Sequence, residues 1–233
     1  PYVIFKENGT NLARLRLWHN PQWTKNVYEA AGSQLYNDLY DVERAINEAK
    51  KNGMPTLLDF HYSDNWADPG QQRIPEAWED IKEIDVLVDS IYNYTYNTLT
   101  YLNERGLMPK YVQIGNETNC GMLYTNALAG FPTCNSCEGE WANLRLVING
   151  AIKAVRDVSL DSEVDTKIML HIADPKNVDW WFDNLINRTE VTDFDIIGFS
   201  YYPIWHTTVA VTQLSNKIAD FKAKYGRDII ILE

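Results

Sequence analysis

The sequence is poor in basic residues and contains no long apolar run. Its 21 Lys and Arg face 32 Asp and Glu, which gives a formal net charge of −11, and no basic stripe is present. This charge argues against nucleic acid and anionic membranes as partners. No run approaches the roughly 20 apolar residues that span a bilayer. We therefore expect neither a nucleic acid nor a membrane as a partner.

Glycine-rich phosphate loops are also missing, and histidine is scarce. Neither GxGxxG nor GxxxxGK[ST] occurs, which disfavours a doubly wound nucleotide-binding sheet. The four histidines are scattered, and His61 has no second histidine at i+2 or i+4. A rival interpretation is a metal site, whose ligands would be Asp59, His61, Asp64, Asp68, His171 and Asp174. The scarcity of histidine makes this interpretation weak, and we expect no metal and no cofactor.

Only three cysteines are present, at positions 120, 134 and 137. The last two form "CNSC" within a polar Gly/Pro/Asn loop, "LAGFPTCNSCEGEW". A redox CxxC is typical of the start of a βαβ unit, and a zinc site needs more ligands, so both interpretations are weak. We expect a short disulfide between Cys134 and Cys137, with Cys120 free.

Aromatic residues, by contrast, are abundant. Eight Trp and fourteen Tyr stand in 233 residues. Most of them can simply fill a core. A surplus of Trp and Tyr also suits a cleft in which flat, amphipathic ligands such as sugar rings are stacked.

Short apolar runs alternate with segments of helical period, which predicts a parallel sheet with helices outside it. The expected strands are 12–18, 55–62, 111–117, 167–173, 195–202 and 228–233. The clearest helical segments are 35–52, 84–106, 141–157 and 209–225, and Gly53, Gly106 and Gly226 stand where helices would end.

Polar or aromatic residues end several of these strands, as at the mouth of a (β/α)8 barrel. We therefore predict a TIM barrel and a single catalytic domain over residues 1–233. Only six strands are visible, the chain opens on what reads as the last turns of a helix, and it stops at a strand tip. We expect the domain to be incomplete at both ends, without its first strand and last β/α unit. The alternative is a smaller, open six-stranded fold.

Two carboxylates, Glu117 and Glu233, end the third and sixth expected strands. An ionised carboxylate at such a place needs partners or a shifted pKa. Two acids at one barrel mouth suit glycoside hydrolysis, in which one protonates the leaving oxygen and the other attacks the sugar. Asn116 would contact a sugar 2-hydroxyl. The alternative for each acid is a salt bridge at the barrel rim.

Strand alternation places Arg14, Arg16 and Trp18 on one face, directed into the barrel. A buried arginine needs a carboxylate, and Glu233 would be kept ionised by such a partner. A purely structural role is the alternative.

In "DFHYSDNWADP", His61 and Asp68 fit hydrogen bonding to sugar hydroxyls, and Trp66 fits stacking on a sugar ring. The alternative is that the tryptophan simply packs the loop against the protein.

Four motifs, in order, resemble glycoside hydrolase family 53, the endo-β-1,4-galactanases. They are "RLRLW.NP", "LLDFHYSDNWADPGQQ", "VQIGNE" with "GML", and "DIIGFSYYPIW", followed by Glu233. The resemblance covers nearly the whole chain and implies a retaining enzyme with a (β/α)8 barrel. It implies cleavage of β-1,4-galactan in the arabinogalactan side chains of pectin. It also implies that the enzyme is secreted and acts as a monomer.

The same resemblance assigns roles to individual residues. Glu117 is implied to be the general acid/base and Glu233 the nucleophile. Tyr202, rather than Tyr201, is implied to donate its hydroxyl to the nucleophile. The other implied substrate-site residues are Asn116, Arg14, His61, Trp66, Asp68 and His171. Ala173 departs from the family pattern His-Leu-Asp, and Asp174 is a candidate to replace the lost contact. A glucan- or mannan-cleaving enzyme of the same clan and a non-catalytic sugar-binding barrel remain alternatives.

Overall fold

The computed structural model describes residues 1–27 and 34–233, and a six-stranded parallel sheet forms its centre. The strand order is β1-β2-β3-β6-β7-β8. Each strand lies inside one of the predicted apolar runs, so these predictions are confirmed. The strands are β1 (Ala13–Leu17), β2 (Thr56–Phe60), β3 (Tyr111–Ile114), β6 (Lys167–Ala173), β7 (Ile196–Ser200) and β8 (Asp228–Ile231).

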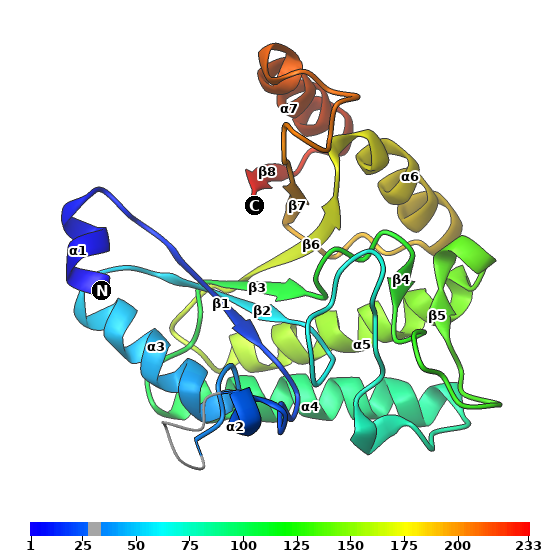
Figure 1. Cartoon of the computed structure of the whole chain (residues 1–233), viewed down its shortest axis with the longest axis horizontal. Coiled ribbons are helices and arrows are strands. Elements are labelled where there is room, and N and C mark those ends of the chain that lie inside the picture. Colours follow the sequence, from blue (N-terminus) through cyan, green and yellow to red (C-terminus); the bar gives the residue numbers. More distant parts are fainter. Residues whose placement is uncertain (28–33) are drawn as a thin grey trace.

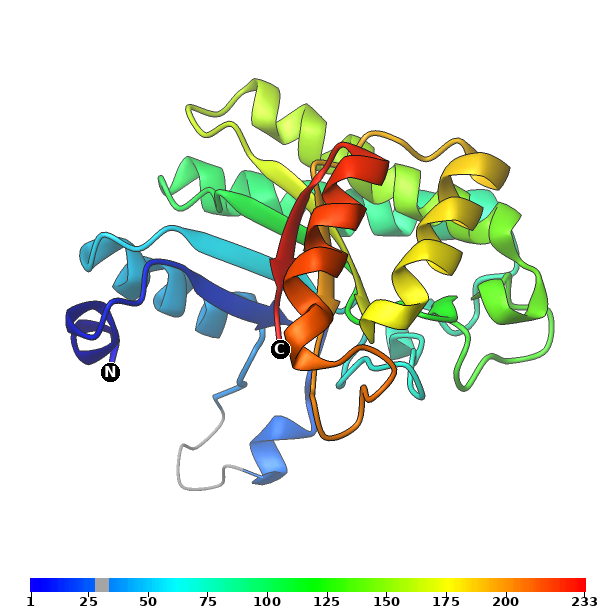
Figure 2. The ribbon, with the colours of Figure 1, turned by 90° about the horizontal axis from the view of Figure 1, so that it is seen from above.

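Helices follow the strands along the chain and cover the outside of the sheet. In Figure 1, α3, α4 and α5 lie along one side of it, and α6 and α7 lie beyond β6 and β7. Figure 2 shows α7 alongside β8. The helices are α1 (Tyr2–Glu7), α2 (Thr24–Val27), α3 (Leu39–Lys51), α4 (Ile84–Glu104), α5 (Trp141–Leu160), α6 (Val178–Thr189) and α7 (Val211–Tyr225). Short 3₁₀ turns in the described part of the chain include η2 (Glu76–Trp78), η3 (Ser136–Glu138) and η4 (Pro175–Asn177).

Local signals fix the ends of α3. The Asp38 side chain accepts a hydrogen bond of 2.9 Å from the backbone N–H of Asp41, which satisfies one of the free donors at the first turn. Beyond the last turn, Gly53 adopts φ +64°, a left-handed conformation that costs glycine little. The helix therefore ends where the sequence predicts.

Alternation along the strands divides the core in two. Side chains on the outer face of the sheet, such as Leu17, Phe60 and Phe199, pack against the helices in one large cluster. A smaller cluster fills the inner side of the sheet, and its buried members are Leu57, Met169 and Ile196, joined by Leu12, Tyr111, Ile230 and Leu232. Fully burying a side chain of this kind contributes roughly 1.5–3 kcal/mol. The inner cluster forms a floor on which the polar residues of the strand ends rest.

A feature not expected from the sequence is a small antiparallel hairpin beyond the end of β3, made of β4 (Gly121–Met122) and β5 (Cys134–Asn135). A disulfide joins Cys120 to Cys137 across this hairpin, and Cys134 is free and buried. The predicted Cys134–Cys137 disulfide is therefore wrong. Pairing of β4 with β5 brings Cys120 and Cys137 to a Cα–Cα distance of 4.9 Å, and Cys134 belongs to the core.

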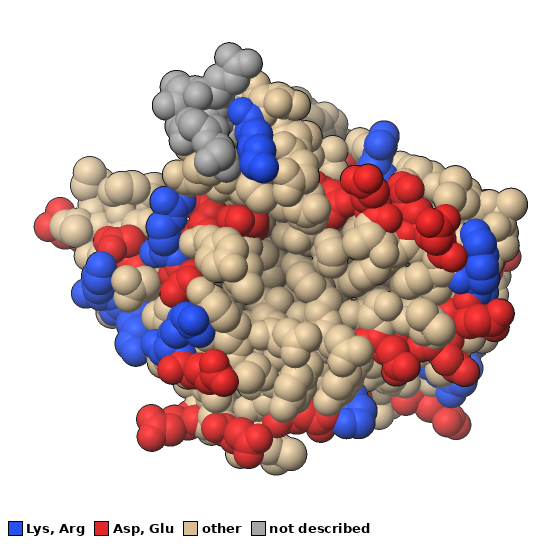
Figure 3. Space-filling view, turned by 90° about the horizontal axis from the view of Figure 1, so that it is seen from below, with Lys and Arg blue, Asp and Glu red and all other residues tan. Residues whose placement is uncertain are grey.

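The surface carries charges of both signs. On the face shown in Figure 3, acidic groups alternate with scattered basic ones around a middle that carries neither, and no continuous basic patch covers this face. Within residues 1–27 and 34–233, no helix has the length and apolar character needed to cross a membrane.

Candidate active site

Arg14, on the inner face of β1, is the centre of the polar cluster at the strand ends. Its guanidinium donates hydrogen bonds to four side chains from three other segments, namely β2, β3 with the residues directly after it, and the end of the chain after β8, so it holds them together. The acceptors are Asp59 Oδ2 (2.9 Å), Gln113 Oε1 (3.1 Å), Asn116 Oδ1 (2.6 Å) and Glu233 Oε1 (2.6 Å). This confirms the predicted pairing of Arg14 with Glu233.

Asp59 and Gln113 form the layer beneath. Asp59 is completely buried and accepts hydrogen bonds from Gln113 Nε2 (2.7 Å) as well as from Arg14. Burial alone would raise the pKa of Asp59, but the charge of Arg14, together with the hydrogen bond from His61, outweighs burial and lowers that pKa. A fixed negative charge therefore lies under Arg14, which holds the guanidinium in place.

Glu233 follows β8 and receives hydrogen bonds on both carboxylate oxygens. Arg14 Nη1 donates to Oε1, and the Tyr202 hydroxyl donates to Oε2 at 2.8 Å. Burial would raise the pKa of Glu233, yet the two hydrogen bonds and the charge of Arg14 lower it. In return, burial and the bond to Glu233 raise the pKa of Tyr202 to about 12. Glu233 is thus held as an ionised carboxylate.

Glu117 is in a different environment, just beyond β3. Glu117 is 8% exposed, and its backbone φ of +47° is unusual for a residue other than glycine. Its Oε1 accepts a hydrogen bond of 2.5 Å from the Ser200 hydroxyl. Burial raises the pKa of Glu117, and the charge of Glu233 adds to the rise against the opposing bond from Ser200. Burial therefore contributes more to the rise than the neighbouring carboxylate does.

Asn116 lies between these groups with most of its bonding capacity in use. Its Oδ1 accepts from Arg14 and from Gln113 Nε2 (3.2 Å), and its Nδ2 donates to Ala67 O at 2.8 Å. An amide carries two hydrogens on nitrogen, so one of them is free to donate to a ligand hydroxyl. The predicted contact with a sugar hydroxyl is compatible with this geometry.

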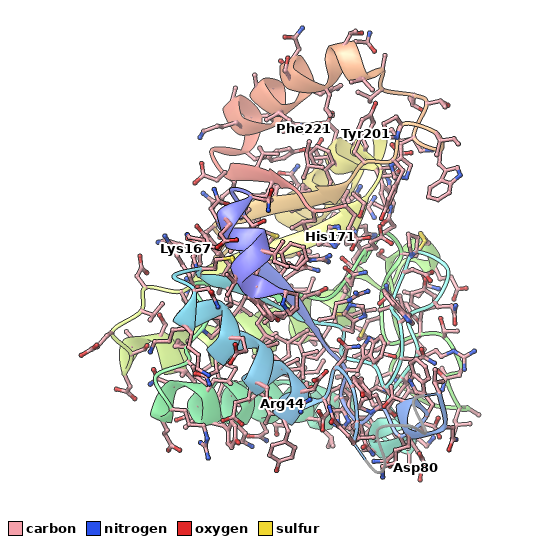
Figure 4. All side chains as sticks on the ribbon, turned by 60° about the vertical axis from the view of Figure 1, so that its left-hand side comes forward. Arg44, Asp80, Lys167, His171, Tyr201 and Phe221 are labelled. Carbon is pink, nitrogen blue, oxygen red and sulfur yellow. A yellow bond between two sulfur atoms is a disulfide. The ribbon has the colours of Figure 1, made fainter. Side chains whose placement is uncertain are left out.

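The two predicted histidines lie beneath the surface rather than on it. His61 is 1% exposed and His171 is not exposed at all. His61 Nδ1 accepts from the backbone N–H of Ala67 (3.0 Å), and its Nε2 lies 3.1 Å from Asp59 Oδ2. In Figure 4, His171 lies among the crowded side chains in the middle of the molecule. Both rings contact other site residues, and their direct contact with a sugar stays a prediction.

The remaining predicted residues are divided between the site and its surroundings. Trp66 is 46% exposed, and the Arg16 guanidinium lies 4.0 Å from its ring centroid, a cation–π contact that helps to hold the ring in place. Asp68 is half-buried, and its charge helps to raise the pKa of Glu117. The Tyr201 hydroxyl donates to Val209 O at 2.6 Å, away from Glu233, which leaves Tyr202 as the tyrosine of the site.

Asp174, the candidate for a replaced contact, is committed to its own turn. It is 5% exposed, and its carboxylate accepts from the backbone N–H of Lys176 (3.1 Å) and pairs with the Lys176 ammonium (3.1 Å). In the described ranges, no three His, Cys, Asp or Glu side chains gather in the way that metal ligands do.

Gln113 and Ser200 are site residues that the sequence analysis missed. Both are polar residues in apolar strands and share the inward period of two with predicted site residues, Gln113 with Glu117 and Ser200 with Tyr202. This alternation is a signal that could have identified both residues. Their hydrogen-bond partners could not be predicted, because the bonds from Ser200 to Glu117 and from Gln113 to Asp59 join residues that are 83 and 54 positions apart.

Comparisons with known proteins identify the family of this chain. The family model described as glycosyl hydrolase family 53 matches residues 1–233. The chain is 39% identical to an arabinogalactan endo-β-1,4-galactanase of Cellvibrio japonicus, over 100% of this chain and 57% of that protein. It is 32% identical to a protein of the same name from Thermothelomyces thermophilus, over 99% of this chain and 64% of that protein. The chain thus spans about three fifths of the length of these relatives.

A solved structure described as the GH53 catalytic domain of Ignisphaera aggregans superposes with a TM-score of 0.80 at 34% identity, covering 99% of this chain and 59% of that one. The parallel six-stranded sheet with its outer helices is accordingly a partial (β/α)8 barrel, as the sequence predicted. The family model, the sequence relatives and the superposition agree with one another. The chain belongs to glycosyl hydrolase family 53.

Proposed function

We propose that this chain provides the active site of a retaining endo-β-1,4-galactanase. The observation that carries the proposal is a pair of carboxyl groups whose surroundings shift their pKa values in opposite directions. The pKa of Glu117 is raised, mainly by burial, and that of Glu233 is lowered by Arg14 and Tyr202. Such a division assigns Glu117 as the acid and Glu233 as the nucleophile.

The chemistry follows in two displacements. Ionised Glu233 attacks the anomeric carbon while Glu117 gives its proton to the departing glycosidic oxygen, and a glycosyl ester forms on Glu233. The ester is neutral, so the charge that helped to raise the pKa of Glu117 is gone. Glu117 then takes a proton from water, the water oxygen attacks the same carbon, and Glu233 leaves with net retention.

Substrate choice is proposed from the relatives, because the two acids are common to many sugar hydrolases. The names of the Cellvibrio japonicus and Thermothelomyces thermophilus proteins support arabinogalactan as the polymer. We propose the β-1,4-galactan side chains of pectin as the substrate. Because a polysaccharide must be cleaved outside the cell, we propose that the enzyme is secreted. We also propose that it acts as a monomer, without nucleic acid or membrane partners.

The test is reducing-sugar release from linear β-1,4-galactan, with cellulose and mannan in parallel, by the protein that carries this sequence at its natural length. We expect release from galactan only, with the β anomer formed first in proton NMR, and loss of release in Glu233→Gln. The matched control is Glu104→Gln, at the exposed end of α4. Release from cellulose or mannan alone would contradict the substrate, and sugar binding without release would contradict catalysis.

A further inference from the structure

Ser200 stands at the end of β7, is completely buried, and bridges Glu117 to His171. Its hydroxyl oxygen lies 2.5 Å from Glu117 Oε1 and 3.0 Å from His171 Nε2. The mechanism above uses neither Ser200 nor His171. A buried hydroxyl placed between a reacting carboxyl group and an imidazole has two possible proton arrangements, and the rest of the geometry decides between them.

The other imidazole nitrogen fixes the direction. The backbone N–H of Glu117 points at His171 Nδ1 at 3.2 Å, and the Gln113 amide nitrogen lies at the same distance. A backbone N–H cannot be reversed, so Nδ1 accepts. Asn116 Oδ1, 3.0 Å from Nδ1, already accepts from Arg14 and Gln113, so it does not require a proton from the ring.

The ring is neutral, because burial and the charge of Arg14 lower the pKa of His171 to about 3. A neutral imidazole that accepts at Nδ1 carries its hydrogen on Nε2. Nε2–H therefore donates to the Ser200 oxygen, and the serine hydrogen is left to donate to Glu117 Oε1. No protein group within the described ranges bonds to the other carboxyl oxygen, Oε2.

We propose that Ser200, oriented by His171, is a positioning residue for Glu117: it keeps Oε1 as a hydrogen-bond acceptor, so that the catalytic proton resides on Oε2. The inference deepens the proposed function and rests on it for its kinetic consequences. With the proton confined to one oxygen, the acid delivers it in a single orientation, and the general base later receives the water proton at the same atom.

Several charged groups face Glu117 and set the background for this effect. They are Arg14 from β1, Asp68 from the loop after β2 and Glu233 after β8, with neutral His171 from β6 behind. None of the first three changes when Ser200 is replaced. A bond that stabilises the ionised carboxyl group is lost, so the pKa of Glu117 rises further in Ser200→Ala.

The experiment compares Ser200→Ala with the conservative Ser200→Thr and with Ser159→Ala, a serine hydrogen-bonded at the end of α5. Carbon-13 NMR titration of the Glu117 carboxyl group needs no substrate. We expect its pKa to rise by roughly one unit in Ser200→Ala, to stay near wild type in Ser200→Thr, and not to move in Ser159→Ala. An unchanged pKa in Ser200→Ala, in a variant that keeps its thermal midpoint, would overturn the inference.

The kinetic arm uses kcat/KM for two aryl β-galactobiosides. A dinitrophenyl leaving group needs little acid assistance, whereas a phenyl leaving group needs it. We expect Ser200→Ala to lower kcat/KM about tenfold on the phenyl substrate and by less than about twofold on the dinitrophenyl one. Equal losses on both would overturn the positioning role. A wild-type protein inactive on galactan, with the NMR shift present, would instead refute the proposed function alone.

Discussion

At the scale of single residues, the charge of Arg14 determines how the acids of the site differ. It lowers the pKa of Asp59 and of Glu233, and it opposes the rise at Glu117. Arg14 is in direct contact with the first two but not with Glu117. The opposite pKa shifts of Glu117 and Glu233, on which the proposed roles rest, therefore follow from which carboxylate the guanidinium contacts and from how deeply each one is buried.

Tyr202 provides a test at this scale. In Tyr202→Phe, Glu233 keeps Arg14 but loses the 2.8 Å bond that favours its ionised form. The pKa of Glu233 should rise, so the acid limb of the kcat/KM profile against pH moves to higher pH, and kcat/KM falls by about 10- to 100-fold at the optimum.

Tyr201→Phe is the matched control, because the Tyr201 hydroxyl bonds to Val209 O instead. Its acid limb should stay in place. An acid limb that does not move in Tyr202→Phe, or one that moves equally in both variants, would separate Tyr202 from the ionisation of Glu233.

At the scale of elements, the hairpin of β4 and β5 stabilises the segment that follows Glu117. Gly121 approaches the facing strand so closely that a Cβ atom there would lie 2.0 Å from Cys134 O. Only glycine fits such an approach. The disulfide from Cys120 to Cys137 closes the same unit. Glu117, the proposed acid/base, is thus connected to a short, cross-linked element and not to an open loop.

The disulfide assignment predicts a peptide map. Digestion without reduction should yield Cys120 linked to Cys137, with Cys134 alkylated only after unfolding because it is fully buried. The disulfide closes a loop between residues that are 17 positions apart. Without this link the unfolded chain gains conformational entropy, so Cys137→Ser should lower the free energy of unfolding by about 3 kcal/mol. Cys134→Ala retains the link and is the control. Recovery of a Cys134–Cys137 peptide would contradict the structure.

The sequence predicts the elements and the two acids because both depend on short-range patterns. Apolar runs, helical periods and glycines such as Gly53 are local, and so is an acid at a strand end. The disulfide was mispredicted because it depends on the register of β4 with β5, which brings Gly121 opposite Asn135. The burial of His171 and its bond to Ser200 depend on three neighbouring strands, which no single window of sequence contains.

At the scale of the whole molecule, the inner face of the sheet combines a small apolar floor with charged groups above it. Packing of the floor is favourable to stability, whereas desolvation of Glu117 is not. Because Arg14 and Tyr202 favour the ionised form of Glu233, the two carboxyl groups that we propose to be catalytic should have opposite effects on stability at neutral pH.

Replacing each acid by its amide tests this contrast. A raised pKa in the folded state means that ionised Glu117 destabilises the fold above that pKa, and the destabilisation is relieved as pH falls and the group takes its proton. Glu117→Gln, which keeps an oxygen to accept from Ser200, should raise the thermal midpoint at pH 7, and the gain should shrink as pH falls.

Glu233 has the opposite sign. Its lowered pKa means that its ionised form stabilises the fold at pH values above its unfolded pKa, and that this contribution is lost as pH falls through the folded value. Glu233→Gln should therefore lower the thermal midpoint at pH 7, and this deficit should diminish as pH falls.

Calorimetry of both variants and of the wild-type protein across pH measures the two differences in thermal midpoint directly. If Glu117→Gln were less stable than wild type at pH 7, burial could not be the main source of the raised pKa, and the assignment of Glu117 as the acid would lose its physical basis.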